Sequence, residues 1–316
     1  MNVNDIKILS EKIQAQINRV IIGQETTVKF VTAALFAGGH VLLEDVPGSG
    51  KTTLAKTLGR TIDGTFSRIQ MTPDLLPADM TGVNYFNMKT QEFQFLKGPV
   101  FANVLIADEI NRATPKTQSG LLECMEEKQV TVDGTTYPLD DVFLVIATQN
   151  PVESQGVFPL PEAQIDRFLV RLNMNYPQHD EIVQVLRTHV AGSERRLAEV
   201  EKTATTREIA EARTCIRNIF VQDDILSYVV DIVEETRHHA GIILGVSQRG
   251  ALSLVRMSQV LAAFDGRDYV LPDDVKEAAV PVLAHRLALR YSEQAVPHRD
   301  QELVREILER VAIPVE

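Results

Sequence analysis

The chain has 316 residues, which suits about two domains, taking roughly 100–200 residues for each. Its 44% hydrophobic and 24% charged residues are ordinary for a soluble globular protein. The net charge of −11 argues against a surface devoted to nucleic acid, because sequence-independent binding to phosphates depends on clustered Lys and Arg. A local basic channel stays open as an alternative.

The cysteines and the first residues indicate a cytoplasmic location. Cys124 and Cys215 lie in helical patterns and far from any Cys-x-x-Cys spacing, so neither a disulfide framework nor a zinc site is expected. The first residues lack the basic stretch and apolar core of a signal peptide. No run of about 18 apolar residues occurs, so we expect no membrane segment.

Two helices are predicted before the first strand. Apolar residues recur at helical spacing from Ile6 to Val20, and a second helical pattern covers about residues 25–37. The connection at residues 20–24 is an apolar turn. It could cover an adenine ring in a nucleotide-binding domain, or it could be a connection that faces the core.

Residues 41–54 predict a buried strand, a glycine-containing turn and the first turn of a helix, which together form a phosphate-binding loop. Gly48 and Gly50 allow backbone conformations in which successive N–H groups converge on an anion at the positive end of the helix. Lys51 would reach the β- and γ-phosphates of a nucleotide, and the Thr52 hydroxyl would bind Mg²⁺. The expected binding residues are Pro47, Gly48, Ser49, Gly50, Lys51, Thr52 and Thr53.

This loop departs from the strict pattern G-x-x-x-x-G-K-[ST], because Asp45 stands where the first glycine is required. A strict pattern search therefore misses it. The alternative is an ordinary strand-to-helix turn that happens to contain Gly-Ser-Gly-Lys.

An insertion is predicted after the second strand at residues 66–71. Two prolines and a glycine in residues 72–82 exclude a long regular helix there. Residues 83–87 and 92–96 have the alternation and separation of a β-hairpin. We expect this segment to project from its domain.

Two acidic residues end a predicted central strand. The apolar run at residues 104–107 is followed by Asp108 and Glu109, so the strand would present two carboxylates at its carboxyl end. Asp108 would hold the Mg²⁺ shell and Glu109 would polarise the attacking water. A strand end with a solvated acidic turn is the alternative, which a phosphate loop upstream makes less favoured because the acids then complete one site.

A helix beginning at Thr114-Pro115 and a hairpin at residues 129–137 lead to a third buried strand at 142–147. The strand ends close to Asn150, which could position the water against the γ-phosphate or cap a turn before proline. A last strand is expected at residues 168–172.

The roles of two arginines, Arg167 and Arg249, are left open by their local sequence. Asp166-Arg167, just before the last strand, is by itself more typical of a surface ion pair. Arg249 lies in the first turn of a helix capped by Ser247, where the helix dipole disfavours a cation unless an anion is nearby. An exposed arginine at such a position is also common.

From about Pro177 onward strands stop and helices run to the end. This change predicts one domain at residues 1–176 and a second at 177–316.

In their order and spacing, the phosphate loop, Asp108-Glu109, Asn150, Arg167 and Arg249 resemble those of the AAA+ ATPases, and within them the MoxR family. The resemblance covers nearly the whole chain. Asp45, at the position of the first glycine of the strict pattern, resembles a normal variant within that family. The segments that carry it are residues 43–48 (LEDVPG), 107–113 (ADEINRA), 147–151 (ATQNP), 162–168 (EAQIDRF) and 266–270 (GRDYV).

The resemblance implies an α/β core with a five-stranded parallel sheet, an insertion in its second helix, a hairpin before the sensor strand and an all-helical lid. It also implies a homo-oligomeric ring, usually a hexamer, with ATP at each interface. The implied roles are Walker A for Lys51 and Thr52, Walker B for Asp108 and Glu109, sensor 1 for Asn150, the finger that reaches a neighbour's nucleotide for Arg167, and sensor 2 for Arg249.

The function implied by the family is that of a Mg²⁺-dependent, chaperone-like ATPase. It would remodel or activate client protein complexes, often with a partner that carries a von Willebrand factor A domain. A DNA-directed or chelatase-type motor subunit is the alternative, because such proteins share the core and the insertion. The acidity and the lack of a separate DNA-binding domain favour the first. A third possibility, a nucleotide-binding regulator that does not hydrolyse ATP, is disfavoured because both Glu109 and Arg167 are present.

Overall fold

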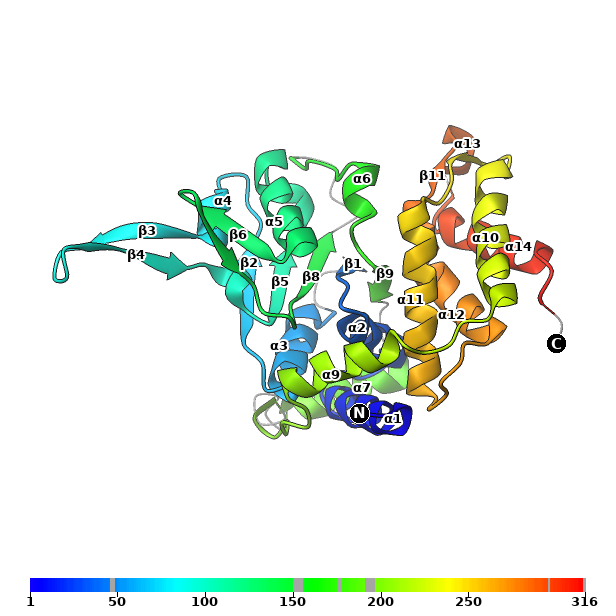
Figure 1. Cartoon of the computed structure of the whole chain (residues 1–316), viewed down its shortest axis with the longest axis horizontal. Helices are drawn as coiled ribbons and strands as arrows, with labels where there is room; N and C mark the ends of the chain where they lie inside the picture. The colour runs from blue at the N-terminus through cyan, green and yellow to red at the C-terminus, as the bar shows by residue number, and fades with distance from the viewer. Residues whose placement is uncertain (46–48, 150–155, 175–177, 191–196, 295, 315–316) are drawn as a thin grey trace.

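The computed structural model describes residues 1–316 apart from 46–48, 150–155, 175–177, 191–196, 295 and 315–316. Its centre is a parallel sheet of five strands in the order β2-β5-β8-β1-β9. A two-stranded hairpin extends from one end of the molecule, and a group of helices lies at the other (Figure 1). The strands of the sheet are β1 (Val41–Asp45), β2 (Phe66–Gln70), β5 (Val104–Asp108), β8 (Leu144–Gln149) and β9 (Val170–Met174).

Both faces of the sheet are buried, as expected for parallel strands that read as continuous apolar runs. Side chains alternate between the faces. In β5, Val104 and Ile106 belong to the core that continues into the N-terminal and C-terminal helices. Leu105 and Ala107 belong to a second core with Leu121 and its neighbours. The predicted α/β class with a five-stranded parallel sheet is confirmed.

The helices around the sheet begin and end largely where their sequence signals lie. The apolar positions of the first helix are buried, and Gly38, with φ of 66°, ends the second in the left-handed conformation. The Thr114 hydroxyl caps the helix that starts at Pro115. These helices are α1 (Val3–Asn18), α2 (Glu25–Ala37), α3 (Lys51–Thr61) and α5 (Pro115–Glu127).

The predicted insertion is present between β2 and β5 and projects from the sheet (Figure 1). At the base of its hairpin, the Phe95 ring stacks on Tyr137 of the second hairpin, with ring centroids 4.1 Å apart. Both hairpins were expected from the sequence and are confirmed. The elements are α4 (Pro77–Thr81), β3 (Gly82–Asn87) and β4 (Glu92–Lys97), then β6 (Gln129–Val132) and β7 (Thr135–Pro138).

The last strand of the sheet begins two residues later than expected, at Val170. The preceding backbone closes a turn, in which Phe168 N donates to the Ile165 carbonyl at 3.0 Å. This turn follows the short helix α6 (Glu162–Ile165). The four residues between Ile165 and Val170 therefore carry Asp166 and Arg167 on a tight connection rather than on a strand.

The C-terminal part is helical, as predicted, except for a short antiparallel pair that the sequence pattern did not indicate. The expected domain boundary at Pro177 falls outside the described residues and stays a prediction. Within the described ranges, no helix is both long enough and apolar enough to cross a membrane. The elements are α7 (His179–Val190), α9 (Thr206–Ile216), α10 (Asp223–His238), β10 (Ile242–Leu244), α11 (Gln248–Phe264), α12 (Pro272–Leu283), η3 (Ala284–Arg286), β11 (Ala288–Leu289), α13 (Tyr291–Gln294) and α14 (Arg299–Arg310).

A buried ion pair attaches these C-terminal helices to the sheet. The Arg286 side chain is 2% exposed and donates from Nε to Asp166 Oδ1 at 2.8 Å. Its Nη2 donates to the Phe168 carbonyl at 2.7 Å. Burial lowers the pKa of Arg286 to about 10, although Asp166 acts in the opposite direction. The surface pair between Asp166 and Arg167 is therefore not formed, because Asp166 is bound to a buried arginine instead.

We expect Asp166→Asn to lower the free energy of unfolding by about 2–3 kcal/mol, somewhat less than for breaking a fully buried pair, because Asp166 is partly exposed. Urea denaturation followed by circular dichroism measures this change. Asp265→Asn is the matched control, since Asp265 pairs with Arg267 but is 63% exposed. It should cost less than about 1 kcal/mol. Equal losses in the two variants would contradict the prediction.

Candidate functional site

The phosphate loop leads directly into α3. Gly50 is the N-cap residue, with φ of 93°, and no side chain of the described residues caps this end of the helix. The positive end of the helix dipole at the start of α3 attracts an anion, and the first N–H groups of a helix have no partner within the helix itself. Lys51, Thr52 and Thr53 form the first turn, as predicted. Pro47 and Gly48 lie outside the described residues.

Asp108 and Glu109 lie at the carboxyl end of β5, as the sequence predicted. The Asp108 side chain is 5% exposed and accepts a hydrogen bond from Arg68 Nε at 2.6 Å. Glu109 Oε2 accepts from Gln70 Nε2 at 2.8 Å and from Arg112 Nη1 at 3.0 Å. Both carboxylates are therefore neutralised or hydrogen-bonded within the chain.

The backbone of Glu109 is held in an uncommon conformation. Its φ is 58°, a left-handed value that costs energy for a residue with a side chain. Its N–H donates to Thr148 Oγ1 at 2.9 Å, and the Thr148 hydroxyl also lies 3.5 Å from Asp108 Oδ1. Thr148 on β8 therefore fixes the end of β5 and orients both acids.

Sequence reasoning missed Arg68, Gln70 and Thr148. The signal that could have found the first two is their spacing, since residues two apart on a strand face the same side. Strand β2 pairs with β5 so that Gln70 lies opposite Asp108. Which strand would pair with β5 could not be read from the sequence pattern.

Asp108 and Thr52 are residues of the types that bind magnesium ions in proteins. A carboxylate such as that of Asp108 and a hydroxyl such as that of Thr52 are oxygen ligands of the kind that Mg²⁺ prefers. Three or more His, Cys, Asp or Glu side chains do not gather as a metal cluster anywhere in the described part of the chain. A magnesium ion held mainly by water and phosphate oxygens needs no such cluster.

Asn150, the predicted sensor 1 residue, lies outside the described residues. Its neighbour Gln149 ends β8 and donates from Nε2 to Glu44 Oε1 at 3.0 Å. Glu44 also accepts from Arg171 Nη1 at 3.3 Å, and Arg171 pairs in turn with Asp300. Burial lowers the pKa of Arg171, and the Glu44 carboxylate opposes this effect. These hydrogen bonds and ion pairs connect the three adjacent strands β8, β1 and β9 with α14.

Arg167 and Arg249 meet at a third acidic residue. Arg167 Nη1 lies 2.8 Å from Glu126 Oε2, and Arg249 Nη2 lies 2.6 Å from Glu126 Oε1. Neither Glu126 nor the meeting of the two arginines was indicated by any pattern in the sequence. In the described parts of the chain, neither arginine contacts Asp108 or Glu109, so the structure does not bring all the predicted site residues together.

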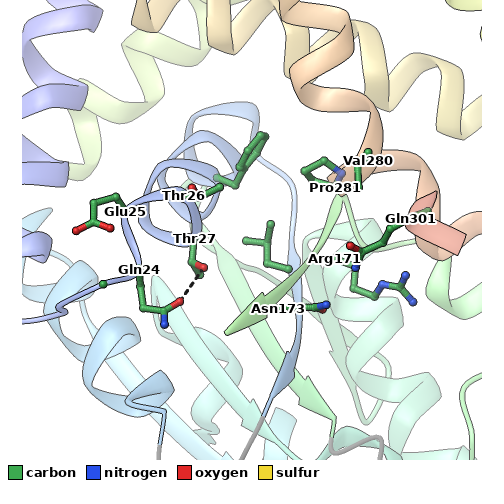
Figure 2. A pocket seen from close by; sticks show the side chains of 13 residues that line it. Gln24, Glu25, Thr26, Thr27, Arg171, Asn173, Val280, Pro281 and Gln301 are labelled. Carbon is green, nitrogen blue, oxygen red and sulfur yellow. Dashed lines mark hydrogen bonds between the residues drawn. The ribbon is translucent and has the colours of Figure 1, made fainter. Parts of the chain in front are cut away.

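A cavity of about 340 Å³ lies between the core and the C-terminal helices (Figure 2). Gln24 and Thr27 border it on one side, Asn173 of β9 on another, and Val280 and Pro281 of α12 above them. The complete lining is Gly23, Gln24, Glu25, Thr26, Thr27, Phe30, Arg171, Leu172, Asn173, Val280, Pro281, Ala284 and Gln301.

The apolar turn at residues 20–24 contributes to the core and to the lining of the cavity, and its predicted contact with an adenine ring stays a prediction. Ile21 is 6% exposed and belongs to the core, whereas Gly23 and Gln24 line the cavity. Ile21 also lies beside the phosphate loop, 3.9 Å from where a Cβ on Gly50 would be. Asn173 Oδ1 is buried and has no hydrogen-bond partner in the described structure. The cavity thus begins two residues after the side chain that lies beside Gly50, and it offers an unpaired acceptor.

Comparison with known proteins agrees with this geometry. The family "ATPase family associated with various cellular activities (AAA)" matches residues 40–170, and the AAA lid domain matches residues 234–309. The uncharacterized protein YeaC of Bacillus subtilis is 45% identical over 99% of this chain and 97% of its own length. A crystal structure of a proposed ATPase from Cytophaga hutchinsonii has a TM-score of 0.92 and 38% identity, covering 99% of this chain and 97% of its own.

Two further relatives carry the name of the family that the motifs resemble. Chaperone MoxR1 of Mycobacterium tuberculosis is 40% identical over 95% of this chain and 81% of its own length. Protein MoxR of Methylorubrum extorquens is 31% identical over 99% of this chain and 97% of its own length. Because these relatives match nearly its whole length, and the ATPase and lid regions follow each other along it, the chain belongs to the MoxR family of AAA+ ATPases.

Proposed function

We propose that the chain binds ATP with Mg²⁺ and hydrolyses it to ADP and phosphate, as the motor of a chaperone-like protein that remodels or activates client complexes. The observation that carries this proposal is the order of the sheet, in which β8 separates β1 from β5. The helix N-terminus at Lys51 and the acids Asp108 and Glu109 therefore share one edge of the sheet. An anion-binding helix end beside two carboxylates is the arrangement that phosphoryl transfer to water needs.

The cavity in Figure 2 would hold the base and ribose of ATP. Its volume of about 340 Å³ is within the usual range for small-molecule sites. The unpaired Oδ1 of Asn173 could accept a hydrogen bond from the exocyclic amino group of adenine. Because Gly23 of the cavity lies two residues after Ile21, which is beside Gly50, a nucleotide in the cavity could extend its phosphates toward the phosphate loop.

For hydrolysis, Glu109 would act on the attacking water and Asp108 would hold the magnesium shell together with Thr52. When bound, the magnesium ion would neutralise charge on the phosphate oxygens. Arg68 and Arg112, which now pair with the two acids, would have to release part of each carboxylate. Asn150 would help position the water.

Arg167 and Arg249 would act on the nucleotide of a neighbouring subunit in a ring, which we propose to be hexameric. This is supported by the lack of a contact between either arginine and Asp108 or Glu109 among the described residues, and by their shared position at Glu126. An arginine that meets a neighbour's γ-phosphate stabilises charge that develops in the transition state.

The projecting hairpin would bind the client or the von Willebrand factor A domain partner. Phe86, Met88 and Phe93 at its outer end are 47%, 82% and 75% exposed. Exposed apolar groups of this kind mark interaction sites more often than structural ones. An apolar end in an acidic chain does not favour the alternative of a DNA-directed motor. The cytoplasmic location stays a prediction from the sequence.

We expect nucleotide binding and hydrolysis to separate at two positions. Lys51→Ala should lose ATP affinity, because Lys51 contacts phosphate in the ground state. Glu109→Gln should keep affinity while turnover falls by about 10²–10⁴-fold, the usual effect of removing a positioned base. Equilibrium binding of a fluorescent ATP analogue and steady-state phosphate release measure the two effects. Normal turnover of Glu109→Gln would refute the assignment.

We expect specific ATPase activity to rise with protein concentration as rings assemble. Arg167→Ala should lower turnover by about 10³–10⁵-fold, the usual contribution of an arginine finger. Mixing Arg167→Ala with Lys51→Ala subunits should restore part of the activity, because an intact finger then meets an intact phosphate loop. Concentration-independent activity of a proven monomer, or full activity of Arg167→Ala, would defeat the oligomer proposal.

Replacing the outer part of the hairpin, residues 85–94, by a short turn should leave folding and basal ATPase unchanged but remove stimulation by a partner protein. The reason is that Phe95, which makes the stacked contact with Tyr137, stays in place. Phe95→Ala is the contrasting variant and should destabilise the fold. Stimulation of the wild type by DNA rather than by protein would support the motor alternative instead.

A further inference from the structure

We propose that Glu126 is a positioning residue, which holds Arg167 and Arg249 side by side so that both meet the same phosphate group. This inference rests on the proposed function, since it assigns those arginines to a nucleotide. It concerns a carboxylate at the last turn of α5, outside the phosphate loop and the acidic pair.

Each arginine is bound to a different oxygen of the Glu126 carboxylate. Arg167 Nη1 meets Oε2 at 2.8 Å, and Arg249 Nη2 meets Oε1 at 2.6 Å. Arg167 Nη1 also donates to the Leu122 carbonyl, one turn earlier in α5, at 3.0 Å. The two guanidinium groups therefore lie on either side of one planar group, and their separation is set by its width.

Each guanidinium retains donors for a second anion. A guanidinium carries five N–H donors, and each of these arginines uses only one terminal nitrogen in its contacts with the described residues. The remaining donors can form the forked contacts that suit phosphate oxygens. The side chains are 31% and 48% exposed, so a ligand can reach them.

The charges favour this arrangement over two neighbouring arginines with no carboxylate between them. Two like charges at such short range repel each other, and a carboxylate between them offsets that repulsion. One negative charge shared by two positive ones leaves a net positive charge, which still attracts a phosphate group. Glu126 can therefore keep the arginines together without cancelling their affinity for an anion.

The backbones that carry the two arginines are also tied together. Asp166, next to Arg167, accepts a hydrogen bond from the Ser247 hydroxyl at 3.1 Å. Ser247 is the N-cap of α11, two residues before Arg249. Because Arg286 fixes the same Asp166 carboxylate, the two arginines have a rigid base, and Glu126 determines where their side chains lie.

Two neighbouring glutamates provide matched controls. Glu123 and Glu127 line the same cavity of about 230 Å³ as Glu126 and Arg167. In the described structure neither pairs with an arginine, and Glu127 instead accepts from Gln129 Nε2 at 3.1 Å. Glu123→Gln therefore makes the same change in charge on the same helix without touching the arginine pair.

The test compares steady-state ATPase kinetics of Glu126→Gln and Glu123→Gln at protein concentrations that saturate assembly. We expect kcat of Glu126→Gln to fall by about 10- to 100-fold, as for a misplaced catalytic group, with KM for ATP within about 3-fold of the wild type. Glu123→Gln should match the wild type. Size-exclusion chromatography and thermal unfolding check that both variants assemble and fold.

A double-mutant cycle shows whether Glu126 acts through the arginines. In an Arg249→Ala background, Glu126→Gln should cost less than it does alone, because the pair is already broken. The inference applies only if Arg167→Ala is inactive. In that case it is overturned if the kcat of Glu126→Gln for ATP equals or exceeds that of Glu123→Gln, or if Glu126→Gln loses only assembly. If Arg167→Ala itself keeps full activity, the proposed function of the finger fails instead, so the two failures are distinguishable.

Discussion

Parallel pairing of the strands is the constraint on which the rest of this structure depends. In a parallel sheet every carboxyl end lies at one edge, and ligands bind in the crevice outside that edge. Strand β8 between β1 and β5 brings Thr148 against Asp108 and Glu109, while the phosphate loop follows β1 on the other side. The buried apolar runs that make these strands pair therefore also assemble the site.

The second requirement is a fixed attachment of the lid. Arg286 is buried against the carbonyl of Phe168 and the carboxylate of Asp166, which is costly for a charge unless its partners stay in place. The same carboxylate accepts from Ser247 at the start of α11. The lid and the connection that carries Arg167 are thus parts of one hydrogen-bonded unit, and the cavity of about 340 Å³ lies between the lid and the core.

Charged groups of the site are compensated within the chain itself. Asp108 is paired with Arg68, Glu109 with Arg112, and both Arg167 and Arg249 with Glu126. Under the proposed function, binding of a nucleotide would exchange these ion pairs for new ones, rather than bury free charges. Breaking the partly exposed pairs at Glu126 would cost little, because exposed pairs are individually weak, whereas the pair of Arg68 with the buried Asp108 would cost more.

The sequence by itself determined the strands of the central sheet to within about two residues, the helices that follow Thr114 and Ser247, both hairpins, and the residue types of the phosphate loop and the acidic pair, because these depend on local periodicity and turn chemistry. It did not determine the partners of Asp166, Arg167 and Arg249. Those depend on how segments far apart in the chain meet, as Glu126 and Arg249 do across 123 positions. A charged residue has many possible partners in a sequence but only one set of neighbours in a packed fold, so only the tertiary structure decided which carboxylate each arginine binds.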